Sequence, residues 1–320
     1  MLAAIRFFED RRNRVLSLAA LSVLLFTLVD LRGSGFGTLL APVFGDTSEA
    51  GFGAQIACAV VLTALIAMNL FLLELLPKSL RLPVVWAELF GLCIVFFLSF
   101  GLDFDFIQSK FLFLITQGAV TTVYVSLISI AIACVFAMIA ALAKLSGNPL
   151  FFGLSSFYIS FFRGLPLLMQ IYLIYIGLPQ LGFVVDPIPA GIAALSICYG
   201  AYMAEIFRAG IVGVPKGQAE AAAALGLNPG ITFLKVTLPQ AMRLIVPPTG
   251  NQFIAMLKDS SLVSVVGVWE LTFVAKTAGR SEFKHVEMLI TASLVYWVMS
   301  ICFELIQARI ERHYGKAHAR

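Results

Sequence analysis

The stretch PKGQAEAAAALGLNPGITFLKVTLPQA, residues 215–241, is the longest polar interruption between the late apolar segments of the chain. Pro215 suits the first turn of a helix, and the alanine-rich run that follows has very high helix propensity. Gly226 suits a left-handed helix stop, and residues 228–230 read as a turn. The stretch therefore predicts a short helix, a turn and a second short helix that ends near Pro239.

The alanine-rich helix of this loop has a thin backbone and carries Glu220 as its one charged anchor. Such a helix can lie deep in the groove of a partner protein. The alternative is a simple helical hairpin that rests on the membrane surface, and composition does not decide between the two.

The composition of the whole chain requires a membrane. Hydrophobic residues make up 60% of the 320, and charged residues only 12%, about half the share of a soluble domain. The net charge of +4 is scattered between apolar segments and forms no basic stripe, so a nucleic-acid partner is not expected. Lipid must therefore solvate most of the surface.

Eight segments are apolar enough to approach the ~20 residues that a membrane-spanning helix needs. The basic N-terminus resembles a signal peptide, but no small-x-small cleavage site follows, so we expect a first helix that is retained. With both termini in the cytoplasm, most Lys and Arg residues fall on the cytoplasmic side. The predicted segments are 15–31, 54–76, 84–102, 111–143, 151–178, 189–212, 243–275 and 287–309.

The polar loop resembles a known family motif. Glu220-Ala221-Ala222, Gly226 and then Val236-Thr237-Leu238-Pro239 are similar to the EAA loop of ABC-importer permeases, with Val236 in place of the usual Ile. Four further stretches resemble the polar amino-acid permease branch of that family: residues 161–168, 201–210, 214–218 and 257–262. The resemblance covers about residues 111–312.

This resemblance implies an all-α integral membrane protein with about eight transmembrane helices, the last five forming an ABC type I importer permease core at 111–312. Residues 1–110 would be an extension with three transmembrane helices and no assigned task, and 313–320 a cytoplasmic tail. The implied location is the bacterial cytoplasmic (inner) membrane. The implied partners are two ATP-binding cassette subunits, an extracytoplasmic substrate-binding protein and a second permease subunit, identical or related.

The resemblance places the coupling to ATP hydrolysis at Glu220, Ala221, Ala222 and Gly226. The chain contains no GxxxxGK[ST] phosphate-binding loop, so we expect no catalytic residue and no cofactor, and the energy must come from a partner. Glu205 and Arg208 lie three residues apart on one helix face, and we expect an ion pair that orients the loop.

Charges within a membrane-spanning segment are costly and usually face a cavity or a partner. Arg163, followed by Gly164 and Pro166, marks a helix break, and breaks of this kind bind ligands in transporters. Our hypothesis is that Arg163 attracts the carboxylate of an amino acid and Asp259 its ammonium group, with Gly164 and Ser260 as hydrogen-bonding groups. The alternative is that Arg163 and Asp259 pair with each other or with Lys258. Gln170, Tyr172 and Tyr175 are expected to serve packing.

Two rival functions remain at this point. A secondary transporter driven by an ion gradient would need intramembrane carboxylates and an internal repeat, but Glu74 and Glu88 lie near predicted span ends and no repeat is visible. A membrane enzyme would need a catalytic constellation. The three histidines lie in a loop and the tail without ligand spacing, and the five cysteines form no CxxC pair, so no metal site is expected.

Overall fold

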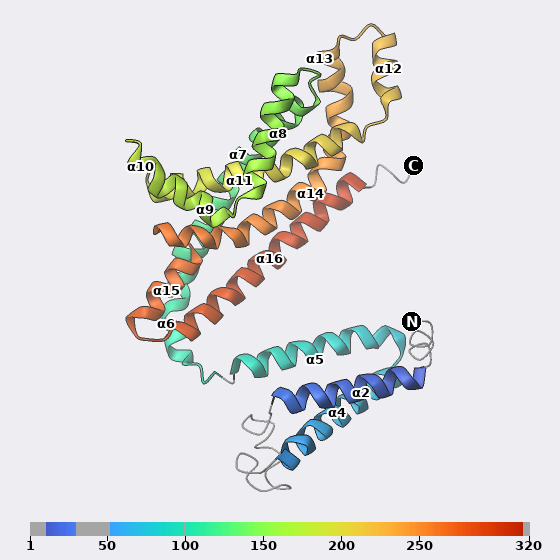
Figure 1. The fold of residues 1–320 in the computed structure, drawn as a ribbon, viewed down its shortest axis with the longest axis vertical. Coiled ribbons are helices and arrows are strands. Elements are labelled where there is room, and N and C mark those ends of the chain that lie inside the picture. The colour runs from blue at the N-terminus through green and yellow to red at the C-terminus, as the bar shows by residue number, and fades with distance from the viewer. Residues whose placement is uncertain (1–10, 30–51, 99, 316–320) are drawn as a thin grey trace. The chain divides into compact units, whose positions relative to one another are not determined.

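The computed structural model describes residues 11–29, 52–98 and 100–315, and all its regular elements are helices (Figure 1). The chain divides into two compact units, residues 1–98 and 99–320, which are described separately. The permease core was expected to begin at residue 111; the second unit begins twelve residues earlier.

In the first unit, the described residues form three helices: α2 (Arg11–Val29), α4 (Phe52–Leu75) and α5 (Lys78–Leu98). Only Cys58 and Ala59 of α4 are buried, and no residue of α5 is. Glu88 accepts a hydrogen bond of 3.0 Å from Nδ2 of Asn69. It lies in the middle of the 21-residue α5, so the expectation that it sits near a span end is wrong.

The second unit begins with one 42-residue helix, Phe104–Leu145. It comprises α6 (Phe104–Phe113), the π-helical turn η2 (Leu114–Ala119) and α7 (Val120–Leu145). Asp103 caps its N-terminus, since its carboxylate accepts a 2.9 Å hydrogen bond from the Phe106 amide. The fourth span therefore starts before the predicted residue 111.

The fifth predicted span is broken where the sequence indicates. Helix α8 (Pro149–Gly164) ends at Gly164, and α9 (Leu167–Tyr172) leads through η3 (Leu173–Gly177) into α10 (Leu178–Gln180). The two arms are bent by 105°. Leu165 is extended and Pro166 has no N–H to donate, so neither residue can continue the helix.

Helix α11 (Pro187–Val212) is the centre of this unit and packs against α7, α8, α9 and α14 (Leu238–Asp259). The largest hydrophobic core cluster draws residues from α7, α11 and α14. A second cluster joins η2, α15 (Leu271–Ser281) and α16 (His285–Gly315). There, a Cβ on Gly118 would lie 2.8 Å from the Leu271 Cα, so glycine is required for this close crossing.

The polar loop forms α12 (Lys216–Ala224) and α13 (Pro229–Thr232). Gly226 adopts φ +79°, the left-handed stop that the sequence predicts. The prediction that the second helix ends near Pro239 is wrong, because α13 continues through the π turn η4 (Phe233–Thr237) into α14. The π turn widens the backbone ladder before Pro239, where the proline ring would otherwise clash with a carbonyl.

The seventh predicted span, 243–275, is also interrupted. After α14 the chain forms the 3₁₀ helix η5 (Ser260–Val266), turns at Gly267 with φ +87° and resumes as α15 at a bend of 51°. Among the described residues, five helices are long and apolar enough to cross a membrane, or seven if each bent pair is one span. The apolar part of α2, Leu18–Val29, is shorter.

The loops of the second unit separate to its two ends. Figure 1 shows α12 and α13 at one end of this unit, and α6 and α15 at the other. The loop 215–241 and the connection from α15 to α16 therefore lie at opposite ends, as alternating spans require.

Candidate functional site

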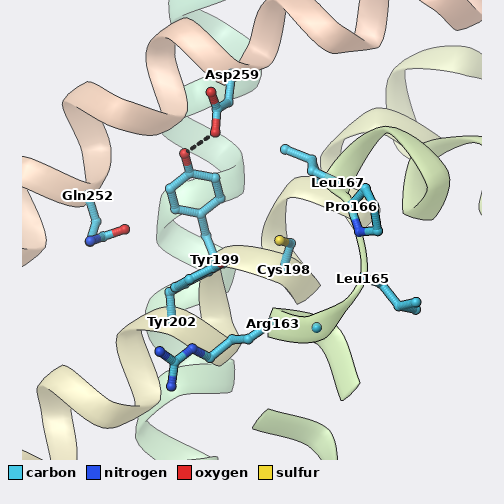
Figure 2. Close-up of a pocket in the computed structure, with 10 residues that line it drawn as sticks. Arg163, Leu165, Pro166, Leu167, Cys198, Tyr199, Tyr202, Gln252 and Asp259 are labelled. Carbon is cyan, nitrogen blue, oxygen red and sulfur yellow. Dashed lines mark hydrogen bonds between the residues drawn. The ribbon is translucent and has the colours of Figure 1, made fainter. Parts of the chain in front are cut away.

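A pocket of about 370 Å³ lies at the break between α8 and α9. Its wall is completed by one face of α11 and by the second half of α14 (Figure 2). The volume is within the range of small-molecule sites. The lining residues are Arg163, Gly164, Leu165, Pro166, Leu167, Cys198, Tyr199, Tyr202, Gln252 and Asp259.

The break is held open by Gln170, which is 3% exposed. Its Nε2 donates to the carbonyls of Phe162 (2.9 Å) and Leu165 (3.0 Å). One side chain thus binds a carbonyl on the last turn of α8 and another beyond it. Tyr172 and Tyr175 pack against the main core cluster. All three residues serve structure, as expected.

Arg163 lies on the last turn of α8 and its side chain enters the pocket (Figure 2). Its guanidinium carbon is 5.2 Å from the centroid of the Tyr202 ring, within the range of a cation–π contact. A Cβ on the neighbouring Gly164 would meet no atom within 4 Å, so this glycine leaves backbone accessible from the pocket.

Asp259, the last residue of α14, faces Arg163 from the other side of the pocket. Its Oδ2 accepts a hydrogen bond of 2.7 Å from the Tyr199 hydroxyl. Within the described part of the chain, no ion pair joins Arg163, Lys258 or Asp259 to one another. The structure therefore does not contain the alternative arrangement, in which Arg163 and Asp259 form an ion pair with each other or with Lys258.

Ser260 does not belong to the pocket, which corrects the expectation that it offers a hydroxyl there. The side chain is fully buried and its Oγ donates to the Leu257 carbonyl at 2.7 Å. Ser260 follows Asp259 directly, and neighbouring residues of a helix project about 100° apart, so Ser260 points into the core while Asp259 lines the pocket.

Sequence reasoning missed four polar residues of the lining: Cys198, Tyr199, Tyr202 and Gln252. Two signals were present. Tyr199 and Tyr202 are three residues apart and so share one face of a helix. Gln252 precedes Asp259 by two helical turns and projects from the same face of α14.

The predicted coupling residues lie on the most exposed part of the second unit. Glu220, Ala221 and Gly226 are exposed, whereas Ala222 is buried, with 4% of its surface exposed. Leu225, beside them, is 82% exposed. One side of α12 thus rests on its own chain through Ala222, and the remainder is free to contact another molecule.

The base of this loop carries the ion pair expected from the sequence, with an additional cation. The carboxylate of Glu205 contacts Arg208 at 2.9 Å and the Lys144 ammonium at 2.5 Å. Lys144 comes from the end of α7, so the cluster ties α7 to the end of α11 that leads into the loop.

An all-helical membrane protein with two broken spans, a charged pocket at one break and an exposed helical loop is a membrane transport protein. The chain matches the family model "Binding-protein-dependent transport system inner membrane component" over residues 133–316. It belongs to this family, and within it to the amino-acid permease subunits of ABC importers. The ion-gradient alternative is thereby excluded.

Two relatives and a solved structure match about two thirds of this chain and nearly the whole of their own length. The probable amino-acid permease protein YxeN of Bacillus subtilis is 37% identical over 68% of this chain and 98% of its own. The L-cystine transport system permease protein TcyB of the same organism is 34% identical over 70% of this chain and 96% of its own length. The crystal structure of an amino acid ABC transporter with histidines has TM-score 0.62 and 36% identity, and covers 66% of this chain and 99% of that one.

Proposed function

We propose that this permease holds its amino-acid cargo in the pocket at the α8–α9 break and receives its driving force through α12. The observation that carries the proposal is a pair of opposite charges, Arg163 and Asp259, that line one pocket without pairing with each other. A free amino acid carries the complementary pair, a carboxylate and an ammonium group.

In this arrangement the substrate carboxylate binds Arg163, and the backbone carbonyl of Gly164 at the end of α8 can accept a hydrogen bond from a donor on the substrate. The ammonium group binds the Asp259 oxygen that Tyr199 leaves free. Tyr199 holds the carboxylate of Asp259 in place, because its hydroxyl donates to the other oxygen. Binding both ends of the zwitterion gives each of these two charges an opposite partner in a charge-assisted hydrogen bond.

The coupling proposal rests on the exposure of α12. Its alanine side chains keep the helix narrow, so that it fits a groove on an ATP-binding subunit. Glu220 supplies the anchoring charge, Ala221 and Ala222 the narrow surface, and Gly226 the turn that returns the chain to α13. The complex comprises two ATP-binding cassette subunits, a second permease subunit, identical or related, and an extracytoplasmic binding protein that delivers the substrate. Both termini of this chain then lie in the cytoplasm.

The pocket assignment is tested by reconstituting the assembled transporter in lipid vesicles and measuring uptake of labelled amino acids and ATP hydrolysis. Asp259→Asn should weaken substrate affinity about tenfold or more, since a charged hydrogen-bonding partner is lost. Lys258→Gln, on an exposed neighbour outside the pocket, is the matched control. If Asp259→Asn leaves the substrate affinity unchanged, the pocket is not the amino-acid site that we propose.

The coupling assignment is tested by co-purification. Glu220→Lys should reduce the amount of ATP-binding subunit retained, because it reverses the only charge of the predicted anchor. Asp186→Lys reverses a charge at the opposite end of the unit, before α11, and should retain the complex. Equal retention of the ATP-binding subunit by both variants would contradict docking through α12.

A further inference from the structure

The number and sign of the charged residues that line the pocket indicate which kind of amino acid it accepts. We infer that this pocket selects amino acids whose side chain is polar but uncharged, a carboxamide being the best match. The inference rests on the proposed binding of an amino acid between Arg163 and Asp259, and it adds a specificity that this binding alone does not contain.

The first step is electrostatic. Of the lining residues only Arg163 and Asp259 carry charge, and the two α-substituents of the substrate use both. A cationic side chain would bring a second positive charge with no further carboxylate, and an anionic side chain a second negative charge with no further cation. A further charge on the substrate would lose part of its hydration in the pocket and gain no ionic partner there, so both classes are disfavoured.

The second step concerns the capacity of Asp259. One of its oxygens already accepts the Tyr199 hydroxyl at 2.7 Å. The remaining oxygen serves one ammonium group and cannot also bind a guanidinium in two-pronged geometry. Arg163 is likewise engaged on one side, where its guanidinium stacks on Tyr202. With the substrate carboxylate on Arg163 and the substrate ammonium group on Asp259, each of these two charges already has one ionic partner.

The third step concerns what remains for the side chain of the substrate. Gln252 is half-buried, lines the pocket and makes no side-chain hydrogen bond within the described part of the chain. Figure 2 shows it two turns from Asp259 on the same helix, with its amide free. A primary amide offers both a donor and an acceptor, and it pairs in full with another carboxamide. Leu165 and Leu167 supply an apolar wall for the methylene groups.

The experiment measures binding to the assembled permease and ATP-binding subunits in lipid nanodiscs without the binding protein, so that the pocket alone decides. Equilibrium binding of radiolabelled glutamine, glutamate and arginine is compared. Glutamine and glutamate have nearly the same shape, so their ratio reports charge. We expect glutamine to bind at least about tenfold more tightly than either charged amino acid.

Two variants of one residue sharpen the result. Gln252→Glu adds the missing carboxylate and should reverse the preference, so that arginine binds more tightly than glutamine. Gln252→Leu removes the hydrogen bonds without adding charge, and should weaken glutamine binding while gaining nothing for arginine. Elution as an intact complex on size exclusion shows that each variant has assembled.

The outcomes separate the inference from the proposed function. If arginine or glutamate binds the unmodified complex as tightly as glutamine, the selectivity is overturned and the pocket remains an amino-acid site. This comparison needs no variant and so does not depend on the assembly of Gln252→Glu. If no amino acid binds in any of the three charge classes, the proposed site itself fails.

Discussion

The two units of this chain differ in how much of their apolar helices is buried within the protein. In the second unit, 67% of the most apolar 18-residue stretch of α11 is buried, whereas the corresponding values in the first unit are 11% for α4 and 0% for α5. Lipid is as apolar as leucine, so burial of hydrophobic side chains drives little association within a membrane. Close packing of small residues and satisfied polar groups must therefore hold the second unit together. Among the side chains of the first unit that the structure describes, only Cys58 and Ala59 are buried.

The sharpest test of this difference replaces a glycine in each unit with leucine. Gly118→Leu places a side chain where even a Cβ would lie 2.8 Å from the Leu271 Cα, whereas the position of Gly91 is open. We expect Gly118→Leu to cost about 3 kcal/mol or more, since a backbone atom cannot give way, and Gly91→Leu to be neutral. Thermal unfolding in detergent, followed by size exclusion, measures both. An equal loss of stability in Gly118→Leu and Gly91→Leu would contradict the difference in packing between the two units.

A second test compares one carboxylate from each unit. Glu270 is fully buried, caps α15 through the amides of Thr272 and Phe273, and accepts the Tyr296 hydroxyl at 2.5 Å. Glu270→Ala leaves these donors without an acceptor and should cost about 1–3 kcal/mol. Glu88→Gln keeps an acceptor for Asn69 and should change stability little. The same unfolding assay applies, and a milder effect at Glu270 than at Glu88 would contradict the comparison.

The third test compares two side-chain amides. Gln170→Leu removes two hydrogen bonds across the α8–α9 break and should cost about 1–2 kcal/mol, with weaker substrate binding because Arg163 loses its fixed position. Asn69→Leu removes one exposed bond, which in a membrane contributes about 0.6 kcal/mol on average. Calorimetric titration of the complex with substrate separates the two, because only Gln170→Leu should change affinity.

The smallest effect is expected from an exposed ion pair of the second unit. The Lys284 ammonium beside Asp103 holds the pKa of that carboxyl below its ordinary value of 3.8, and Asp103 raises the pKa of Lys284 above 10.5. The pair therefore stabilises the fold between those two pH values, and loses its effect as pH falls through the lowered pKa of Asp103.

Lys284→Ala should accordingly lower the unfolding temperature slightly at pH 7, and by less at pH 3, because pH 3 lies below the ordinary pKa of 3.8 and Asp103 of the unfolded chain is then largely protonated. Lys276→Ala, another exposed lysine at this end of the unit, should show no pH dependence. A loss that is larger in acid than at neutral pH would show that this ion pair is not the cause.

Local signals made a large part of the fold predictable. Proline and glycine act on their own backbone, so the break at Gly164 and Pro166 and the left-handed Gly226 followed from residue type alone. The EAA resemblance identified the family. The early end predicted at Pro239 was wrong because a π turn, which no residue type announces, accommodates the proline.

Only part of the site could be predicted from the sequence, because some of its residues are specified by contacts and not by residue type. Charge is conspicuous in an apolar chain, so Arg163 and Asp259 stood out. The prediction for Ser260 was wrong because adjacent helical residues project about 100° apart, which places Ser260 in the core rather than beside Asp259 in the pocket. Tyr199 bonds Asp259, sixty residues further along the chain, and Gln252 lines the pocket because α14 packs against α11. Nothing in the immediate neighbours of either residue specifies these contacts.

The uninterrupted path from α13 to the end of α14 has a mechanical consequence. Residues 229–259 form one helical rod about 45 Å long, with the loop that carries α12 at one end and Asp259 at the other. No flexible linker interrupts this rod, and its irregular points are the π turn and the prolines Pro247 and Pro248. Under the proposed coupling, a tilt of only a few degrees at the loop would therefore displace the Asp259 carboxylate by several ångströms.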